Sequence, residues 1–184
     1  MSQIDVQKLQ MLQQKLPNMT ESQVRDILAT LDEHDIIEDR EIARERFIPF
    51  VKKVWPFFIE GPHHRRMADA FERVARGECK RLIINMPPRH TKSEFASYLL
   101  PAWFLGKFPN KKVIQSSNTA ELAVGFGRKV RNLVDGEVYK SLFPNLELRA
   151  DSKAAGRWAT NKGGDYFAIG IGGAVTGKGA DLLI

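Results

Sequence analysis

The stretch from Arg81 to Glu94 constrains the fold of this chain more than any other part of the sequence. Residues 82–84 form a short apolar run, Leu-Ile-Ile, which is typical of a strand buried on both faces. A compact basic loop follows at 87–91, and a helical pattern of apolar residues begins near Glu94. This order predicts an α/β fold in which the loop leads from a buried strand into the first turn of a helix.

The two residues after this loop have the chemistry of a phosphate-binding site. At such sites backbone N–H groups at a helix start face the anion, a lysine reaches the outer phosphates, and a serine hydroxyl ligates Mg²⁺. Lys92 and Ser93 stand where this arrangement needs them. The spacing departs from the Gly-x-x-x-x-Gly-Lys-Ser pattern, because Met86 and Thr91 occupy the two glycine positions. The alternative is an ordinary strand-to-helix turn in which the Lys-Ser pair binds nothing.

The sequence Met-Pro-Pro-Arg-His-Thr-Lys-Ser-Glu at 86–94 resembles the variant phosphate loop (Walker A) of the large terminase subunit of tailed bacteriophages. The His-His pair at 63–64 and the glycine-rich segment at 163–181 carry the same resemblance. That family commonly has Gly where this chain has Thr91. The resemblance extends over about residues 47–184. It implies a P-loop NTPase fold, α/β, with a mainly parallel sheet flanked by helices.

The resemblance also implies ATP and Mg²⁺ as ligands and assigns roles to the loop residues. Lys92 and Arg89 are expected to be catalytic, because positive charge near the β and γ phosphates stabilises the transition state of phosphoryl transfer. Ser93 is the expected Mg²⁺ ligand. The expected nucleotide-binding residues are Pro87, Pro88, Arg89, His90, Thr91, Lys92, Ser93 and Glu94.

In that family the subunit is the ATPase of a motor that packages double-stranded DNA into a preformed capsid. The expected partners are therefore double-stranded DNA, the portal protein, the small terminase subunit and further copies of the chain. The expected location is the cytoplasm of the infected bacterium. Two alternatives stay open: a helicase-like ATPase stimulated by nucleic acid, and a binding module with a degenerate phosphate loop.

The family pattern also divides the chain. Residues 39–184 are expected to form the ATPase domain, cut before the acidic Walker B residues that would follow the apolar run at 182–184. The family's nuclease domain would lie further on. Asp181 precedes that run and is therefore not the Walker B acid. Because half of the catalytic residues would be missing, we expect the isolated chain to hydrolyse ATP only at a background rate.

Charge is distributed unevenly along the chain. The formal net charge is +6, but residues 1–50 contain six basic and ten acidic side chains, so the rest of the chain is strongly basic. A basic body indicates an anionic partner, either a nucleotide or a nucleic acid, or simply a solvated surface. The basic residues that we expect to contact DNA or the nucleotide of a neighbouring subunit are Arg128, Arg131, Arg157 and Lys178.

The remaining sequence predicts a small acidic helical lobe at 1–38, which either packs as an appendage or docks another packaging component. A capping-box pattern at Thr20 and Gln23 precedes its second helix. The expected helices lie at 4–16, from 21 onward, at 39–53 with a kink at Pro49, and at 64–76, 93–105 and 120–133. The further expected strands lie at 111–116, 166–171 and 182–184, and residues 141–162 read as irregular. No apolar run has the length of a membrane span, so no membrane partner is expected.

Overall fold

The computed structural model describes residues 19–184, so the helix expected at 4–16 lies outside the described residues. The chain divides into two compact units between Asp39 and Arg40. Among residues 19–184, none of the helices combines the length and the apolar character that crossing a membrane would require.

Helix α2 (Glu21–Glu45) contains most of the described part of the first unit. The backbone N–H of Thr20 donates to Oε1 of Gln23 over 2.9 Å, and the N–H of Gln23 donates to Oγ1 of Thr20 over 3.4 Å. These reciprocal bonds confirm the capping box, because they satisfy two backbone donors at the helix start. Of the apolar stripe that follows, Leu28 and Leu31 are exposed.

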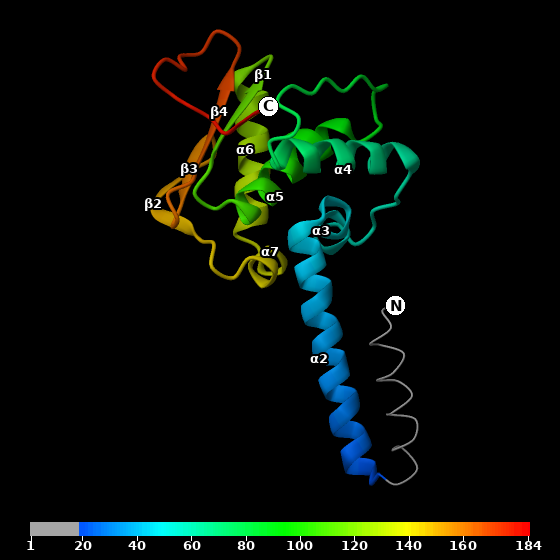
Figure 1. Ribbon diagram of the computed structural model, residues 1–184. Coiled ribbons are helices and arrows are strands. Elements are labelled where there is room, and N and C mark those ends of the chain that lie inside the picture. Colours follow the sequence, from blue (N-terminus) through cyan, green and yellow to red (C-terminus); the bar gives the residue numbers. More distant parts are fainter. Residues whose placement is uncertain (1–18) are drawn as a thin grey trace. The chain divides into compact units, whose positions relative to one another are not determined.

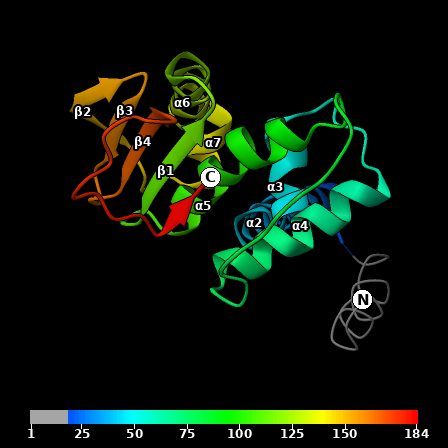
Figure 2. The same ribbon diagram turned by 90° about the horizontal axis from the view of Figure 1, so that it is seen from above.

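The second unit, residues 40–184, contains the phosphate-loop motif (Figures 1 and 2). Its helices after α2 are α3 (Phe47–Val54), α4 (Pro62–Ala75), η2 (Glu94–Leu99), α5 (Leu100–Lys107), α6 (Ala120–Val134) and α7 (Glu137–Leu142). Its strands are β1 (Lys112–Ser117), β2 (Leu148–Ala154), β3 (Arg157–Thr160), β4 (Asp165–Gly170) and β5 (Leu182–Leu183). Helices α4 and α6 and strands β1, β4 and β5 confirm the elements expected in those parts of the sequence.

The five strands form one mixed sheet in the order β2-β3-β4-β1-β5. Strand β1 pairs in parallel with β4 and β5, whereas β3 pairs antiparallel with β2 and β4. The α/β class is confirmed, but the expectation of a mainly parallel sheet is wrong. The reason is β3, which runs opposite to the other four strands, so that both of its pairings, with β2 and with β4, are antiparallel.

The two faces of the sheet are covered differently (Figure 2). The strand register places Val113, Tyr166 and Leu182 on one buried face. Trp158 belongs to this face, and its indole Nε1–H donates to the carbonyl of Gly127 in α6 over 3.3 Å. On the opposite face lies Phe167, and the glycine-rich loop at 171–180 covers it. Helices therefore cover one side of the sheet, and a loop covers the other.

The strand expected at 82–84 is not formed. This segment has no regular secondary structure, and the side chain of Ile83 is 85% exposed. A strand needs the backbone of a neighbour to pair with, and no strand within residues 19–184 pairs with this segment. A groove of about 840 Å³, lined by residues 82–84 and 182–184, lies between the segment and β5, the edge strand of the sheet.

Residues 141–162, expected to be irregular, contain the end of α7 and the hairpin of β2 and β3. The hairpin reverses direction at Ala155 and Gly156, between Ala154 and Arg157, which face each other in the register. Trp158 in β3 is fully buried, and its ring stacks on Tyr166 with the ring centroids 4.9 Å apart. Burial of these two large rings holds the hairpin on the sheet.

The single kinked helix expected at 39–53 is divided at Arg46, which has an extended backbone. The Glu72 carboxylate in α4 accepts hydrogen bonds from Nε of Arg46 and from the backbone N–H of Phe47. The break therefore lies three residues before Pro49, and α4 stabilises it. Pro49 itself lies in the first turn of α3, where a missing N–H is tolerated.

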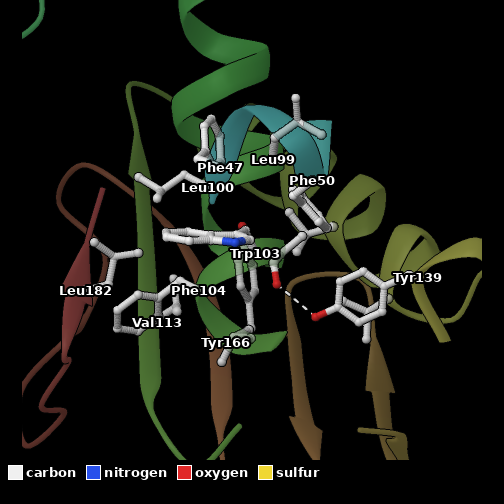
Figure 3. Close-up of a cluster of buried hydrophobic side chains, with 14 of the residues drawn as sticks. Phe47, Phe50, Leu99, Leu100, Trp103, Phe104, Val113, Tyr139, Tyr166 and Leu182 are labelled. Carbon is white, nitrogen blue, oxygen red and sulfur yellow. Dashed lines mark hydrogen bonds between the residues drawn. The ribbon is translucent and has the colours of Figure 1, made fainter. Parts of the chain in front are cut away.

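The core that supports the phosphate loop is aromatic (Figure 3). The Phe47 ring makes edge-to-face contacts with Phe71, Phe95 and Trp103, at centroid separations of 5.3 to 5.6 Å. Phe95 belongs to η2, the helix that begins directly after the loop. The hydroxyl of Tyr139 donates to the carbonyl of Ala102 over 2.8 Å. These contacts fix the helix on which the loop ends.

Candidate functional site

The loop at 87–91 leads from the extended segment at 81–86 into a helical stretch that begins at Lys92. Residues 87–90 are exposed, and Lys92 is half-buried. The Lys92 ammonium donates to the carbonyl of Pro87 over 3.4 Å, so the lysine folds back across the loop. The first N–H groups of a helix have no partner within the helix. The arrangement therefore places a cation and unpaired backbone donors around an open turn.

Two residues of the loop have left-handed backbone conformations, Arg89 with φ of 63° and Thr91 with φ of 59°. This region costs a residue with a Cβ about 1–2 kcal/mol, and it is most unusual for a β-branched side chain. Left-handed residues within a turn direct successive N–H groups into one concavity, which is a common anion-binding geometry. Thr91 thus adopts the conformation for which the related pattern uses glycine.

Side chains, and not glycine, stabilise this turn. Nδ1 of His90 donates to the carbonyl of Pro88 over 2.9 Å, and the hydroxyl of Thr91 donates to the carbonyl of His90 over 2.7 Å. Nε2 of His64, at the start of α4, lies 2.7 Å from Oγ1 of Thr91. The helix-start position expected for His64 is confirmed, but the sequence did not indicate this contact with the loop.

The environment of His64 favours the neutral form of its imidazole. Burial lowers the pKa of His64, the neighbouring His63 lowers it further, and Glu60 raises it. Hydrogen bonds from Lys52 and Arg65 hold the pKa of Glu60 below its usual range. The ring of His64 lies between Phe58 and Phe95, with centroid separations of 4.8 and 4.9 Å.

The helix after the loop begins with one π-helical stretch, η2, before it continues as α5. The backbone N–H of Leu100 bonds to the carbonyl of Phe95, five residues earlier. Pro101 explains this register, because it lacks an N–H and its ring would crowd the carbonyl of Ser97 in a regular α-helix. Single π turns of this kind are frequent at functional sites. The helix expected at 93–105 is thus confirmed with an altered first part.

Ser93 and Glu94 follow the loop directly. Ser93 is exposed in the first turn, where its hydroxyl is accessible to a metal ion. The Glu94 carboxylate accepts a hydrogen bond from Nζ of Lys129 in α6 over 2.9 Å. This ion pair brings a basic residue of α6 close to the loop, and the sequence did not indicate a contact of Lys129 with the loop. The sequence shows three basic residues on this helix, Arg128, Lys129 and Arg131, but not which face of α6 meets η2.

The four other basic candidates do not gather at the loop. Arg128 is exposed on α6, and Arg131 donates to Oδ1 of Asn132 in the same helix. Arg157 and Lys178 line a pocket of about 200 Å³ on the face of the sheet that the glycine-rich loop covers. Nζ of Lys178 lies 3.9 Å from the centroid of the Phe167 ring. The structure thus brings together Arg157 and Lys178, apart from the phosphate-loop residues.

Asp181 has a structural role at the end of the glycine-rich loop. Its carboxylate accepts hydrogen bonds from Nζ of Lys111 and from the backbone N–H of Lys112, each over 2.8 Å. These bonds hold the pKa of Asp181 below its usual range. They join the start of β5 to the start of β1, which accounts for an acidic residue at this position without catalysis.

Within the described residues, one group of side chains has the spacing of a metal site: His34, Asp35 and Glu38 on α2. All three are exposed, and their ligand atoms lie within 4.8 Å of one another. Exposed acidic groups of this kind are common without a metal, so the group supports no function.

Neither a protein-family model, nor a curated protein sequence, nor a solved structure matches this chain. The functional argument therefore rests on the residues of the loop and on their geometry.

Proposed function

We propose that this chain contains the nucleotide-binding part of an ATP-driven motor that moves double-stranded DNA into a preformed capsid. One observation carries the proposal: Lys92 folds across an open turn that contains two left-handed residues and leads into a helix. A turn packed shut, with the lysine directed away, would have argued against an anion site. The resemblance of residues 86–94 to the terminase phosphate loop supplies the motor as the context for this site.

The loop residues fit a triphosphate by their chemistry. Lys92 and Arg89 supply positive charge, and the helix start supplies backbone donors. Ser93 supplies the hydroxyl that phosphate loops use to ligate Mg²⁺. When bound, Mg²⁺ neutralises charge on the β and γ phosphates. The chain's own contribution is therefore to bind and orient the triphosphate tail.

Binding without rapid hydrolysis is the activity that the residues within 19–184 support. Phosphoryl transfer needs an acidic residue that holds the metal and a group that orients the attacking water. Within residues 19–184, the acidic residue adjacent to the loop is Glu94, and it pairs with Lys129. Robust phosphate release by the isolated chain would contradict this part of the proposal.

The pocket at Arg157 and Lys178 supports a contact with the DNA backbone in the same motor, since both cations lie beside Phe167: Arg157 is its partner in the strand register, and Nζ of Lys178 lies over its ring. The proposed terminase role also implies a location and partners. The location is the host cytoplasm, and the partners are the portal protein, the small subunit and further copies of the chain.

The test is calorimetric titration of the chain with a magnesium complex of a non-hydrolysable ATP analogue. Lys92→Ala should weaken binding by at least about thirtyfold, because it removes a charge-assisted contact with the phosphates. Lys162→Ala is the matched control, since Lys162 is exposed in a turn before β4, and it should change the dissociation constant less than about twofold. Binding that ignores Lys92 would favour the binding module with a degenerate loop.

A further inference from the structure

We infer that His64 is a positioning residue for the phosphate loop, whose imidazole allows a threonine to stand at the left-handed position where glycine is usual. The structural part of this inference rests on the hydrogen bonds alone. The consequence for nucleotide affinity rests on the proposed function.

The proton positions around His64 follow from its partners. The backbone N–H of Gly61 donates to Nδ1 over 2.9 Å, so Nδ1 carries no proton. In the neutral ring Nε2 then carries the proton and donates to Oγ1 of Thr91 over 2.7 Å. The Thr91 hydroxyl donates onward to the carbonyl of His90 over 2.7 Å. A single arrangement of protons therefore satisfies all three hydrogen bonds.

These hydrogen bonds act on Thr91, the loop residue whose left-handed backbone is unfavourable for a β-branched side chain. Thr91 has φ of 59°, and its hydroxyl is fixed from both sides, by His64 and by the carbonyl of the preceding residue. The carbonyl of Thr91 accepts a hydrogen bond from the N–H of Phe95 over 2.9 Å, which ties the same residue to the first helical turn. A side-chain network thus holds Thr91 in a conformation that glycine adopts most readily.

The imidazole is itself held in place. His64 is 5% exposed, and its ring is confined by Phe58 and Phe95. Phe95 belongs to η2, so the start of α4, the loop and the first turn after the loop meet at this ring. His64 cannot rotate away from Thr91 without disturbing these contacts. The network is therefore preorganised before any ligand arrives.

The inference is tested with a double-mutant cycle on the whole chain. His64→Phe keeps an aromatic ring, slightly larger than imidazole, and removes both nitrogen atoms, and Thr91→Gly removes the need for the network. With Thr91 in place, His64→Phe should weaken binding of the magnesium ATP analogue about tenfold. Combined with Thr91→Gly, the same change should alter binding less than about twofold. Equal losses with and without Thr91→Gly, or no loss with Thr91 in place, would overturn the positioning role.

A second measurement does not depend on nucleotide. In the ligand-free chain, His64→Phe should accelerate amide hydrogen exchange at residues 87–94, whereas the exposed-site control His34→Phe should not. If His64→Phe fails to fold, His64→Gln, which keeps an N–H donor, replaces it and should show a smaller acceleration. Unchanged exchange would overturn the inference. Failure of the wild type to bind nucleotide would overturn the proposed function, and the exchange result would still decide the role of His64.

Discussion

The phosphate loop at 87–91 and the glycine-rich loop at 171–180 reach unusual backbone conformations by different means. In the first, Arg89 and Thr91 have positive φ, and side-chain hydrogen bonds hold the turn. In the second, Gly172 and Gly177 have positive φ of 87° and 78°, and no side chain is needed for it. The comparison shows that a left-handed turn can be encoded in the residue itself or in its neighbours.

The segments that lead into the two loops differ as well. Strand β4 enters the glycine-rich loop with hydrogen-bonded neighbours on both sides. The segment at 81–86 enters the phosphate loop with no strand beside it in the described part of the chain. The phosphate loop therefore receives its order from the helices that follow and flank it, and the glycine-rich loop from the sheet.

The largest effect is expected where the glycine-rich loop leaves the sheet. A Cβ on Gly170 would lie 2.5 Å from the backbone nitrogen of Ala120, which cannot move easily. We expect Gly170→Ala to destabilise the chain by about 2–3 kcal/mol, measured by urea denaturation. Gly172→Ala is the control: a Cβ there meets nothing within 4 Å, so only the positive φ opposes it, at about 1 kcal/mol. Equal losses would show that packing does not fix this loop.

In the phosphate loop the decisive group should be the Thr91 hydroxyl. Thr91→Val keeps the shape of the side chain but leaves the Nε2–H of His64 without its acceptor. We expect a loss of about 1–2 kcal/mol in the free energy of unfolding, because a buried donor is then unsatisfied. Thr91→Ser keeps the hydroxyl and should lose less than half as much. A valine variant as stable as the wild type would show that the hydrogen bond contributes nothing.

A smaller effect is expected from pH. Burial lowers the pKa of His64 below its ordinary value of 6.5, so near that pH the unfolded chain binds more protons than the folded chain. The contribution of neutral His64 to the free energy of unfolding is therefore complete above about pH 6.5, and it is lost as the pH falls below that value. His63 and Glu60 face the same ring and modify this shift in opposite directions.

The measurement is the free energy of unfolding between about pH 7 and pH 5 for the wild type and for His64→Phe. The variant should show a shallower decline, because it has no imidazole to protonate at this position. The carboxyl of Glu60 has a pKa below 4.5 and changes charge outside this interval. Identical slopes in the two proteins would mean that His64 does not titrate differently on folding.

The sequence predicted those parts of the molecule whose signals are local. The capping box at Thr20 and Gln23 and the helix expected at 120–133 were read correctly, because each depends on residues within one or two turns. Strand β4 was also anticipated, since its residues alternate between the buried face and the other side of the sheet.

The parts that were wrong or missed depend on distant residues. The division of the helix at Arg46 requires the carboxylate of Glu72, and the hairpin of β2 and β3 requires β4, a strand later in the chain, to pair with. The contact of His64 with Thr91 joins residues 27 positions apart. For this contact a signal was present, because a threonine at a glycine position needs a compensating partner.

The segment at 82–84 gives the smallest expected effect and the sharpest contrast with β1. Ile83 is 85% exposed, whereas Ile114 in β1 is 7% exposed. Ile83→Asn should therefore change the free energy of unfolding by less than about 0.5 kcal/mol, as surface substitutions usually do. The matched change Ile114→Asn buries an amide and should cost at least about 2 kcal/mol. If Ile83→Asn proved as harmful as Ile114→Asn, residues 82–84 would be a buried strand in solution, and the phosphate loop would be entered from a sheet, as the glycine-rich loop is.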